Sequence, residues 1–285
     1  MEHTSTLERI LRGIALTLVV VFFMFPILWI ILMSFQTNET ILRSPPTMIF
    51  EPTLTNYRNI FAGQLEGNTA TLEIKFIGNL LNSIILSFGS VALALVLGVP
   101  AAYAFARHKF RGSEDIAFTL LSFRFAPPLL VLLPLTIIFQ QIGLADTYIG
   151  LIWVYQLICL PLILWIVRGY FEDISPDVEH AYRIAGHSWF STFWHIALPL
   201  ARPGIAAAGL LAFIFAWNNF IFALVLASAD KQPVTVGALA FITASGIQYG
   251  QIAAAIVLSI APTLALALYA QRYLVEGLSL GAVKG

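Results

Sequence analysis

Three histidines in the polar stretch 175–204 are the side chains that could bind a metal ion. His180, His187 and His195 are separated by seven and eight residues, and imidazole is a common ligand of zinc. Gly186 is expected to end a helix between the first two histidines, and the stretch contains no cysteine. Because the helix is interrupted and no thiolate assists, we predict no metal site.

A single cation lies inside an apolar stretch of the chain. Arg124 stands about nine residues into the run 116–139, where a lone arginine costs about 2.5–3.5 kcal/mol on membrane-insertion scales. No Asp or Glu lies inside any apolar run to pair with it. Arg124 therefore either faces a transport path and favours an anionic or very polar solute, or pairs with a partner subunit or extends toward the membrane surface.

Two carboxamides interrupt another apolar run. Asn218 and Asn219 follow Trp217, and hydrocarbon penalises such polar groups unless they form hydrogen bonds. They could line a cavity of the size of a sugar, with Trp217 as a stacking surface. They could equally form hydrogen bonds between helices.

The chain contains none of the common catalytic motifs. It has no phosphate-binding loop of the form G-x-x-x-x-G-K-[ST], no H-E-x-x-H and no nucleophile elbow. Its apolar runs hold no pair of carboxylates for acid–base chemistry. We expect that the chain is not an enzyme and that any ATP used in its function is hydrolysed by another subunit.

The composition is that of a membrane protein. Of 285 residues, 59% are hydrophobic and 11% are charged, whereas soluble domains are about one quarter charged. The mean hydropathy is +0.86. The formal net charge is zero, which does not favour nucleic acid as a partner. Lipid must therefore solvate much of the chain.

Six apolar runs are long enough to cross a bilayer, since about 20 helical residues span its core. They lack period-2 alternation, which favours an all-α membrane protein with six transmembrane helices over a barrel. We expect the third run to break at the pair Pro127-Pro128. The predicted spans are 13–34, 78–104, 116–139, 147–168, 204–227 and 250–271, within one transmembrane domain, 1–285.

The basic residues predict the orientation of these spans. The two tails and the second and fourth loops hold ten Lys and Arg, whereas the first, third and fifth loops hold four. The positive-inside rule therefore places both termini in the cytoplasm. The loop 36–77 is then external, and is either a flexible connector or an ordered cap that faces a partner. The loop 172–203 is cytoplasmic.

The stretch 175–204 also predicts two short helices. Ser175 can cap a helix that runs to about Ala185, where Gly186 ends it. Ser188 can cap a second helix, 189–197, which carries several aromatic residues. The pair could insert into a groove of another protein, or it could be an amphipathic element at the level of the lipid headgroups.

This stretch resembles the cytoplasmic loop of permease subunits in binding-protein-dependent ABC importers. The loop of that family has the pattern Glu-Ala-Ala-x-x-Asp-Gly-Ala, followed by aromatic residues and Leu-Pro. Ala181, Gly186 and the pair Leu198-Pro199 match the pattern. In such importers the loop docks in a cleft of the ATPase subunit and transmits its closure to the membrane helices.

The stretch departs from the pattern at two positions. His180 occupies the Glu position, although Glu179 lies one residue earlier, and Ala185 occupies the Asp position. Salt bridges from these two positions to an ATPase are therefore not expected, whereas the glycine turn is kept. The residues that the resemblance assigns to ATPase coupling are Glu179, His180, Ala181, Arg183, Gly186, Trp189, Phe190, Phe193 and Pro199.

Six further stretches resemble the maltose-type carbohydrate permeases, in order and spacing. They are LTNYRNIF at 54–61, NLLNSIILS at 79–87, GVPAAYAFARHKFRG at 98–112, GLADTYIGLI at 143–152, FAWNNFIFALVL at 215–226 and QRYLVEGLSLGAVKG at 271–285. The family's last residues reach toward the ATPase, which implies a second contact at Gly281, Ala282, Val283 and Lys284.

The resemblance implies the permease fold of type I ABC importers and a role in the import of a sugar, polyol or sugar derivative across the inner membrane. The implied partners are a second permease, two ATPase subunits that bind ATP and Mg, and an external solute-binding protein. Arg124, Trp217, Asn218 and Asn219 are our candidates for the solute path. The alternative is a secondary carrier driven by an ion gradient, which usually needs acidic residues inside the membrane.

Overall fold

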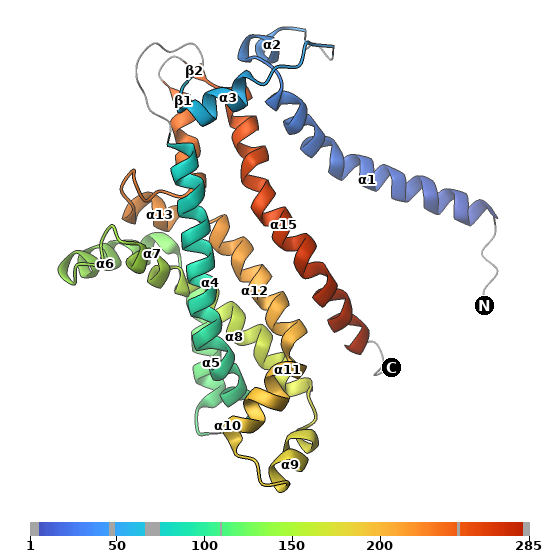
Figure 1. The fold of residues 1–285 in the computed structure, drawn as a ribbon, viewed down its shortest axis with the longest axis vertical. Helices are drawn as coiled ribbons and strands as arrows, with labels where there is room; N and C mark the ends of the chain where they lie inside the picture. The colour runs from blue at the N-terminus through green and yellow to red at the C-terminus, as the bar shows by residue number, and fades with distance from the viewer. Residues whose placement is uncertain (1–5, 46–48, 66–74, 109, 244–245, 282–285) are drawn as a thin grey trace. The chain divides into compact units, whose positions relative to one another are not determined.

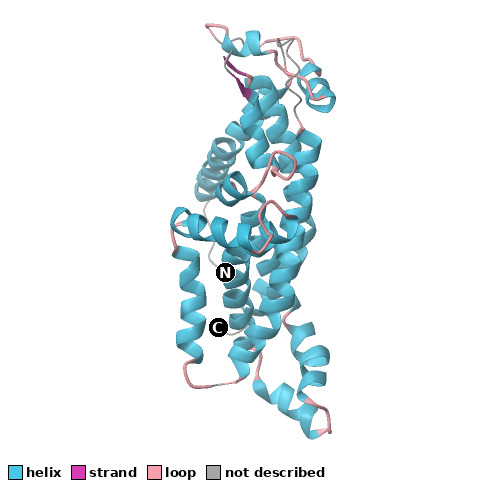
Figure 2. Cartoon of the chain, turned by 90° about the vertical axis from the view of Figure 1, so that its left-hand side faces the viewer, coloured by secondary structure: helices cyan, strands magenta, loops and turns pink. Residues whose placement is uncertain are grey.

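The computed structural model describes residues 6–45, 49–65, 75–108, 110–243 and 246–281. In these ranges the chain is mostly helical, and the strands form one short hairpin (Figure 2). The chain forms two compact units, one of residues 1–76 and 238–261 and one of residues 77–237 and 262–285. The long helix α15 (Tyr249–Gly281) contributes to both.

The first unit contains one long apolar helix and several short elements (Figure 1). Helix α1 spans Thr6–Ser34, and nearly all of its large apolar side chains are exposed, as expected for a helix that lipid solvates. The short elements are α2 (Asn38–Leu42), α3 (Thr55–Ala62), η3 (Ala238–Phe241), β1 (Ile242–Thr243) and β2 (Gly246–Ile247). The strands are antiparallel, with Ile242 opposite Ile247.

Side-chain amides hold the short elements of the first unit together. The buried Asn56 of α3 donates from Nδ2 to the carbonyl oxygens of Ser34, at 3.0 Å, and Gln36, at 2.7 Å. Gln251, at the start of α15, donates to the carbonyl oxygen of Gln64 at 2.8 Å. The described part of the predicted external loop is therefore ordered, and whether it faces a partner stays a prediction.

The second unit is built around three helices. Helices α8 (Gln156–Asp173) and α12 (Arg202–Trp217) pack side by side, and α4 (Phe76–Arg107) contacts both, with its Phe88 ring 5.0 Å from that of Phe213 (Figure 1). Glycines allow the close approach: Gly98 of α4 lies against Ile163, and Gly204 of α12 lies against the ring of Tyr170. The remaining helices are α5 (Ser113–Ser122), η1 (Phe123–Phe125), α6 (Pro128–Gln141), α7 (Tyr148–Val154), α9 (Pro176–Ile184), α10 (Trp189–Thr192), η2 (Phe193–Ala197), α11 (Leu198–Leu200), α13 (Ile221–Leu226) and α14 (Val234–Gly237).

The described residues contain three helices long and apolar enough to cross a membrane, and three bent helix pairs that could each form one more span. The long helices are α1, α4 and the first part of α15. The pairs bend by 96° before α6, by 47° before α8 and by 72° before α12. The first bend lies at Ala126-Pro127, so the predicted break of the third span is confirmed.

The fifth predicted span, 204–227, differs most from the structure. Helix α12 ends at Trp217, and α13 begins only at Ile221. The Nδ2 atom of Asn218 donates to the carbonyl oxygen of Ile214 at 2.8 Å, so this side chain competes with the backbone for helical hydrogen bonds. Asn218 therefore marks the end of a helix that hydropathy alone would continue.

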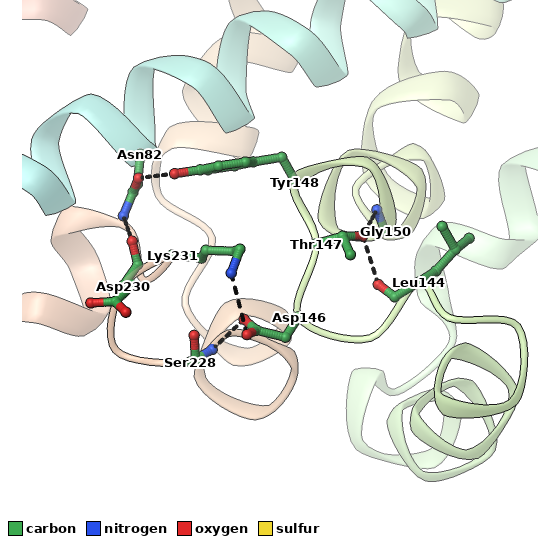
Figure 3. A network of polar contacts seen from close by, with 9 residues as sticks. All are labelled: Asn82, Leu144, Asp146, Thr147, Tyr148, Gly150, Ser228, Asp230 and Lys231. Carbon is green, nitrogen blue, oxygen red and sulfur yellow. Dashed lines mark hydrogen bonds and ion pairs between the residues drawn. The ribbon is translucent and has the colours of Figure 1, made fainter.

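Two loops of the second unit are joined by hydrogen bonds to the start of α4 (Figure 3). The hydroxyl of Tyr148 donates to Asn82 Oδ1 at 2.7 Å, and Asn82 Nδ2 donates to the carbonyl oxygen of Asp230 at 2.9 Å. One asparagine thus links the start of α7 to the turn that follows α13.

The packing of α12 predicts different outcomes for two of its glycines. A Cβ atom at Gly204 would overlap the ring of Tyr170, whereas the nearest atom to a Cβ at Gly209 is Leu95 Cδ1 at 3.7 Å. We expect Gly204→Ala to lower the free energy of unfolding by about 1–3 kcal/mol, as overpacked cores do. Gly209→Ala should change it little. Thermal unfolding of the detergent-solubilised chain would measure both, and equal melting temperatures would contradict the packing described.

The Asp146 carboxylate predicts a pH dependence. Its Oδ1 accepts a hydrogen bond from the Ser228 N–H at 2.8 Å, and Lys231 Nζ lies 3.3 Å from its Oδ2 (Figure 3). These contacts, the Ser228 hydrogen bond first, hold the pKa of Asp146 below its ordinary value. These contacts therefore stabilise the fold fully when the pH is above the ordinary pKa of an aspartate. The stabilisation is lost as the pH falls through the lowered pKa of Asp146.

Asp146→Asn isolates this effect, because asparagine also tolerates the φ of +54° found at this position. We expect the variant to melt at a lower temperature than the unmodified chain at pH 7. The difference should shrink as the pH falls below about 4. A difference that stays constant from pH 7 to pH 3 would show that the carboxylate charge contributes nothing.

Candidate functional site: a helical loop and an apolar cleft

The first half of the stretch 175–204 folds as its capping residues predict. Ser175 Oγ accepts a hydrogen bond from the Asp177 N–H at 3.3 Å, and α9 begins at Pro176. The helix ends at Ile184, and Gly186 adopts the left-handed φ of +97°. The predicted helix start and the glycine turn are thereby confirmed. Helices α9 and α10 lie at the lower end of the second unit (Figure 1).

The second helical segment is longer than predicted. Ser188 Oγ caps it by accepting from the Ser191 N–H at 3.2 Å, and the segment runs through α10, η2 and α11 to Leu200. Pro199 has no N–H to donate, and in the preceding turn the Leu198 N–H donates to the carbonyl oxygen of Phe193, five residues back. This wider π turn lets the segment continue past the predicted end at residue 197.

Glu179 of α9 is buried and holds the loop to α4. Its Oε2 accepts from the hydroxyl of Tyr103, and its Oε1 accepts from Arg107 Nε, both at 2.8 Å. Arg107 Nη2 donates in addition to the carbonyl oxygen of Ile174 at 2.9 Å. The side chains of Arg107 and Glu179 are 7% and 2% exposed. The two charges are thus removed from water, and each has a partner of opposite sign.

An aromatic cluster surrounds this ion pair. The ring of Tyr103 lies 5.2 Å from that of Phe171 and 5.0 Å from that of Phe193, between centroids. Phe171 belongs to α8 and Phe193 to η2. The loop is therefore fixed by polar and apolar contacts to the ends of two helices of the second unit.

Other side chains of the loop are apolar and exposed. Ile184 is 88% exposed and Phe190 is 73% exposed. The rings of Trp189 and Trp194 are also partly exposed, and the Arg183 guanidinium lies 3.7 Å above the Trp189 ring. Such a patch on a charged, structured loop has the character of a binding surface.

The predicted coupling residues therefore differ in burial. Glu179 and Phe193 point inward and position the loop, which the sequence interpretation did not distinguish. Exposed positions are His180, Ala181, Gly186, Trp189 and Phe190, whereas Arg183 and Pro199 are half-buried. Gly281 ends α15, and Ala282, Val283 and Lys284 lie outside the described residues.

The loop histidines make separate contacts. The His187 ring stacks on Tyr182, with centroids 3.9 Å apart. His195 Nδ1 lies 2.9 Å from the carbonyl oxygen of Ser191. His180 is exposed on α9.

A cleft of about 590 Å³ in the second unit brings together three of the four predicted solute-path residues. Arg124, Asn218 and Asn219 line it, among mostly apolar side chains. Arg124 Cζ lies 4.2 Å from the centroid of the Phe215 ring. Trp217 is buried instead and stacks on Phe213, with centroids 5.5 Å apart, because it projects into the helix packing.

Two groups at the loop were not predicted as site residues. Tyr103 and Arg107 lie four residues apart at the end of α4, so both can reach α9. The sequence patterns indicated for Arg107 only a role among the basic residues that predict the orientation of the spans. The signal that could have found the pair is a tyrosine and an arginine on one helix face just before a loop that carries an acid.

Comparison with known proteins places the chain among transport proteins. Residues 94–279 match the family described as binding-protein-dependent transport system inner membrane component. The chain is 36% identical to the trehalose transport system permease protein SugB of Mycobacterium tuberculosis, over 94% of this chain and 95% of that protein. It is 34% identical to the trehalose/maltose transport system permease protein MalG of Thermococcus litoralis, over 99% of both chains.

The fold is also similar to a solved structure. A chain of a bacterial ABC transporter involved in the import of the acidic polysaccharide alginate superposes with a TM-score of 0.76, at 23% identity, over 96% of this chain and 99% of that one. This chain therefore belongs to the binding-protein-dependent transport system inner membrane components, and within them to the permeases of carbohydrate ABC importers.

Proposed function

We propose that this chain is one transmembrane subunit of an ATP-driven importer that moves a sugar, polyol or sugar derivative across the cytoplasmic membrane by alternating access. A separate ATPase, which binds ATP and Mg, drives the cycle through the loop 175–204. Both termini then face the cytoplasm. The complex contains a second permease, two copies of the ATPase and an extracytoplasmic solute-binding protein.

The observation that carries this proposal is the two-sided construction of the loop. One side is fixed to α4 and α8 by the buried Glu179–Arg107 pair and the aromatic cluster. Away from these contacts, the loop exposes Ile184 and Phe190. A protein that binds the exposed side and moves would therefore displace α4 and α8, because the buried side cannot slip without separating two charges in a low-dielectric environment.

The bent helices support the alternating-access part of the proposal. The 96° and 47° bends in the second unit lie at breaks in backbone hydrogen bonding, where helices change direction most readily. The substrate class rests on the relatives, which are named for trehalose and maltose transport. Membership of this family does not favour the ion-coupled carrier.

The exposed side of the loop predicts where the ATPase binds. We expect Ile184→Asp and Phe190→Asp each to reduce the ATPase recovered with the affinity-tagged chain by about tenfold or more, because a charge in an apolar contact is desolvated without a partner. Both side chains are exposed, so the chain should still insert and fold. Quantitative immunoblotting of the purified complex would measure the recovery.

Phe61→Asp is the matched control, since Phe61 is 60% exposed on α3 of the predicted external loop. It should leave the recovery of the ATPase unchanged. Unchanged recovery with both loop variants would contradict the proposed coupling surface.

The buried side of the loop predicts a loss of stability. Glu179→Ala leaves Arg107 buried without its carboxylate, which costs about 3–5 kcal/mol for pairs of this kind. Glu114→Ala is the comparison: Glu114 pairs with Arg168, but its side chain is 76% exposed, so about 0–1 kcal/mol is expected. Limited proteolysis of the loop and thermal unfolding would measure both variants. Equal effects would show that the buried pair does not hold the loop.

A further inference from the structure

We infer that the cleft around Arg124 binds an acidic saccharide, a sugar that carries a carboxylate or sulfonate group. This inference rests on the proposed function, because it treats the cleft as part of the path of the imported solute. It goes further by naming the chemical class of that solute.

The charge of Arg124 is the first argument. The guanidinium lines an apolar cleft, and among the described residues no Asp or Glu forms an ion pair with it. The guanidinium of Arg124 lies over the face of the Phe215 ring. This contact leaves the N–H groups at the edge of the guanidinium available to donate hydrogen bonds. Because a planar guanidinium binds carboxylate-like groups through two parallel hydrogen bonds, an anionic solute would supply the missing partner.

The carboxamide of Asn218 is the second argument. Its side chain is exposed and lines the cleft, and its Nδ2 donates to the carbonyl oxygen of Ile214 at 2.8 Å. The Oδ1 atom of the same carboxamide is an acceptor suited to a sugar hydroxyl. Aromatic side chains complete the lining, with Phe215, Phe220 and Phe222 among them.

These groups together match the three surfaces of an acidic sugar. The anionic group fits Arg124, a hydroxyl fits Asn218, and the C–H face of the ring fits the phenylalanines. A neutral sugar would leave the cation without a partner. The cleft volume of about 590 Å³ is within the range of small-ligand sites and accommodates one or two sugar rings.

The test uses the complex recovered from its own cells through an affinity tag on this chain and reconstituted in nanodiscs. Saturation-transfer NMR would compare the dissociation constants of an aldobiouronic acid and of the neutral disaccharide with the same linkage. We expect the acidic disaccharide to bind at least about tenfold more tightly. Arg124→Gln should abolish this preference, and Arg124→Lys should retain part of it, because lysine keeps the charge but not the planar geometry.

A second variant tests the same inference if Arg124→Gln does not fold. Asn219→Asp places a carboxylate among the residues that line the cleft, where it would compete for Arg124, so it should lower the ratio of acidic to neutral disaccharide affinity. Arg12→Gln, on the exposed helix α1, is the control and should leave the preference intact. The absence of an acidic preference in the unmodified complex, or its persistence in Arg124→Gln, would overturn the inference.

One further outcome separates this inference from the proposed function. If Arg124→Gln instead releases the second permease from the complex, Arg124 pairs with that subunit, and the inference is overturned. Either failure with the ATPase still bound would leave the proposed importer function in place.

Discussion

The buried contact between Glu179 and Arg107 is the interaction on which the loop depends. A carboxylate and a guanidinium removed from water are stable only together, so the position of α9 is fixed relative to the end of α4. The Tyr103 hydroxyl donates to the second carboxylate oxygen of Glu179, and the carbonyl oxygen of Ile174 accepts a further hydrogen bond from the Arg107 guanidinium. Replacement by an apolar pair of equal volume could be as stable, but it would allow sliding that directional hydrogen bonds prevent.

This constraint explains why the loop can be both rigid and exposed. Two short helices with uncovered apolar rings would not hold their arrangement in solution by themselves, since isolated helices of this length are marginal. The aromatic cluster of Tyr103, Phe171 and Phe193 supplies the core that they lack. Ile184 and Phe190 are then presented at fixed positions, so that a partner does not have to order the loop when it binds.

Much of the fold could be predicted from hydropathy and local capping. The break at Pro127-Pro128 and the caps at Ser175 and Ser188 depend on residues that act within a few positions of themselves. The end of α12 at Trp217 could not be read from hydropathy, because two asparagines barely lower the mean over a span. The Glu179–Arg107 pair joins residues 72 positions apart, and one sequence does not show which acid meets which base.

Arg107 and Arg124 of the second unit show how the same side chain serves different purposes. Arg107 lies at a helix end and has a carboxylate of its own chain, so its charge is used for structure. Arg124 lies in an apolar cleft and, among the described residues, has an aromatic ring but no carboxylate. Natural chains do not retain an uncompensated cation in an apolar environment without a gain. Among the described residues no carboxylate compensates the charge of Arg124, and the size of the cleft beside it favours a solute as the partner that we infer.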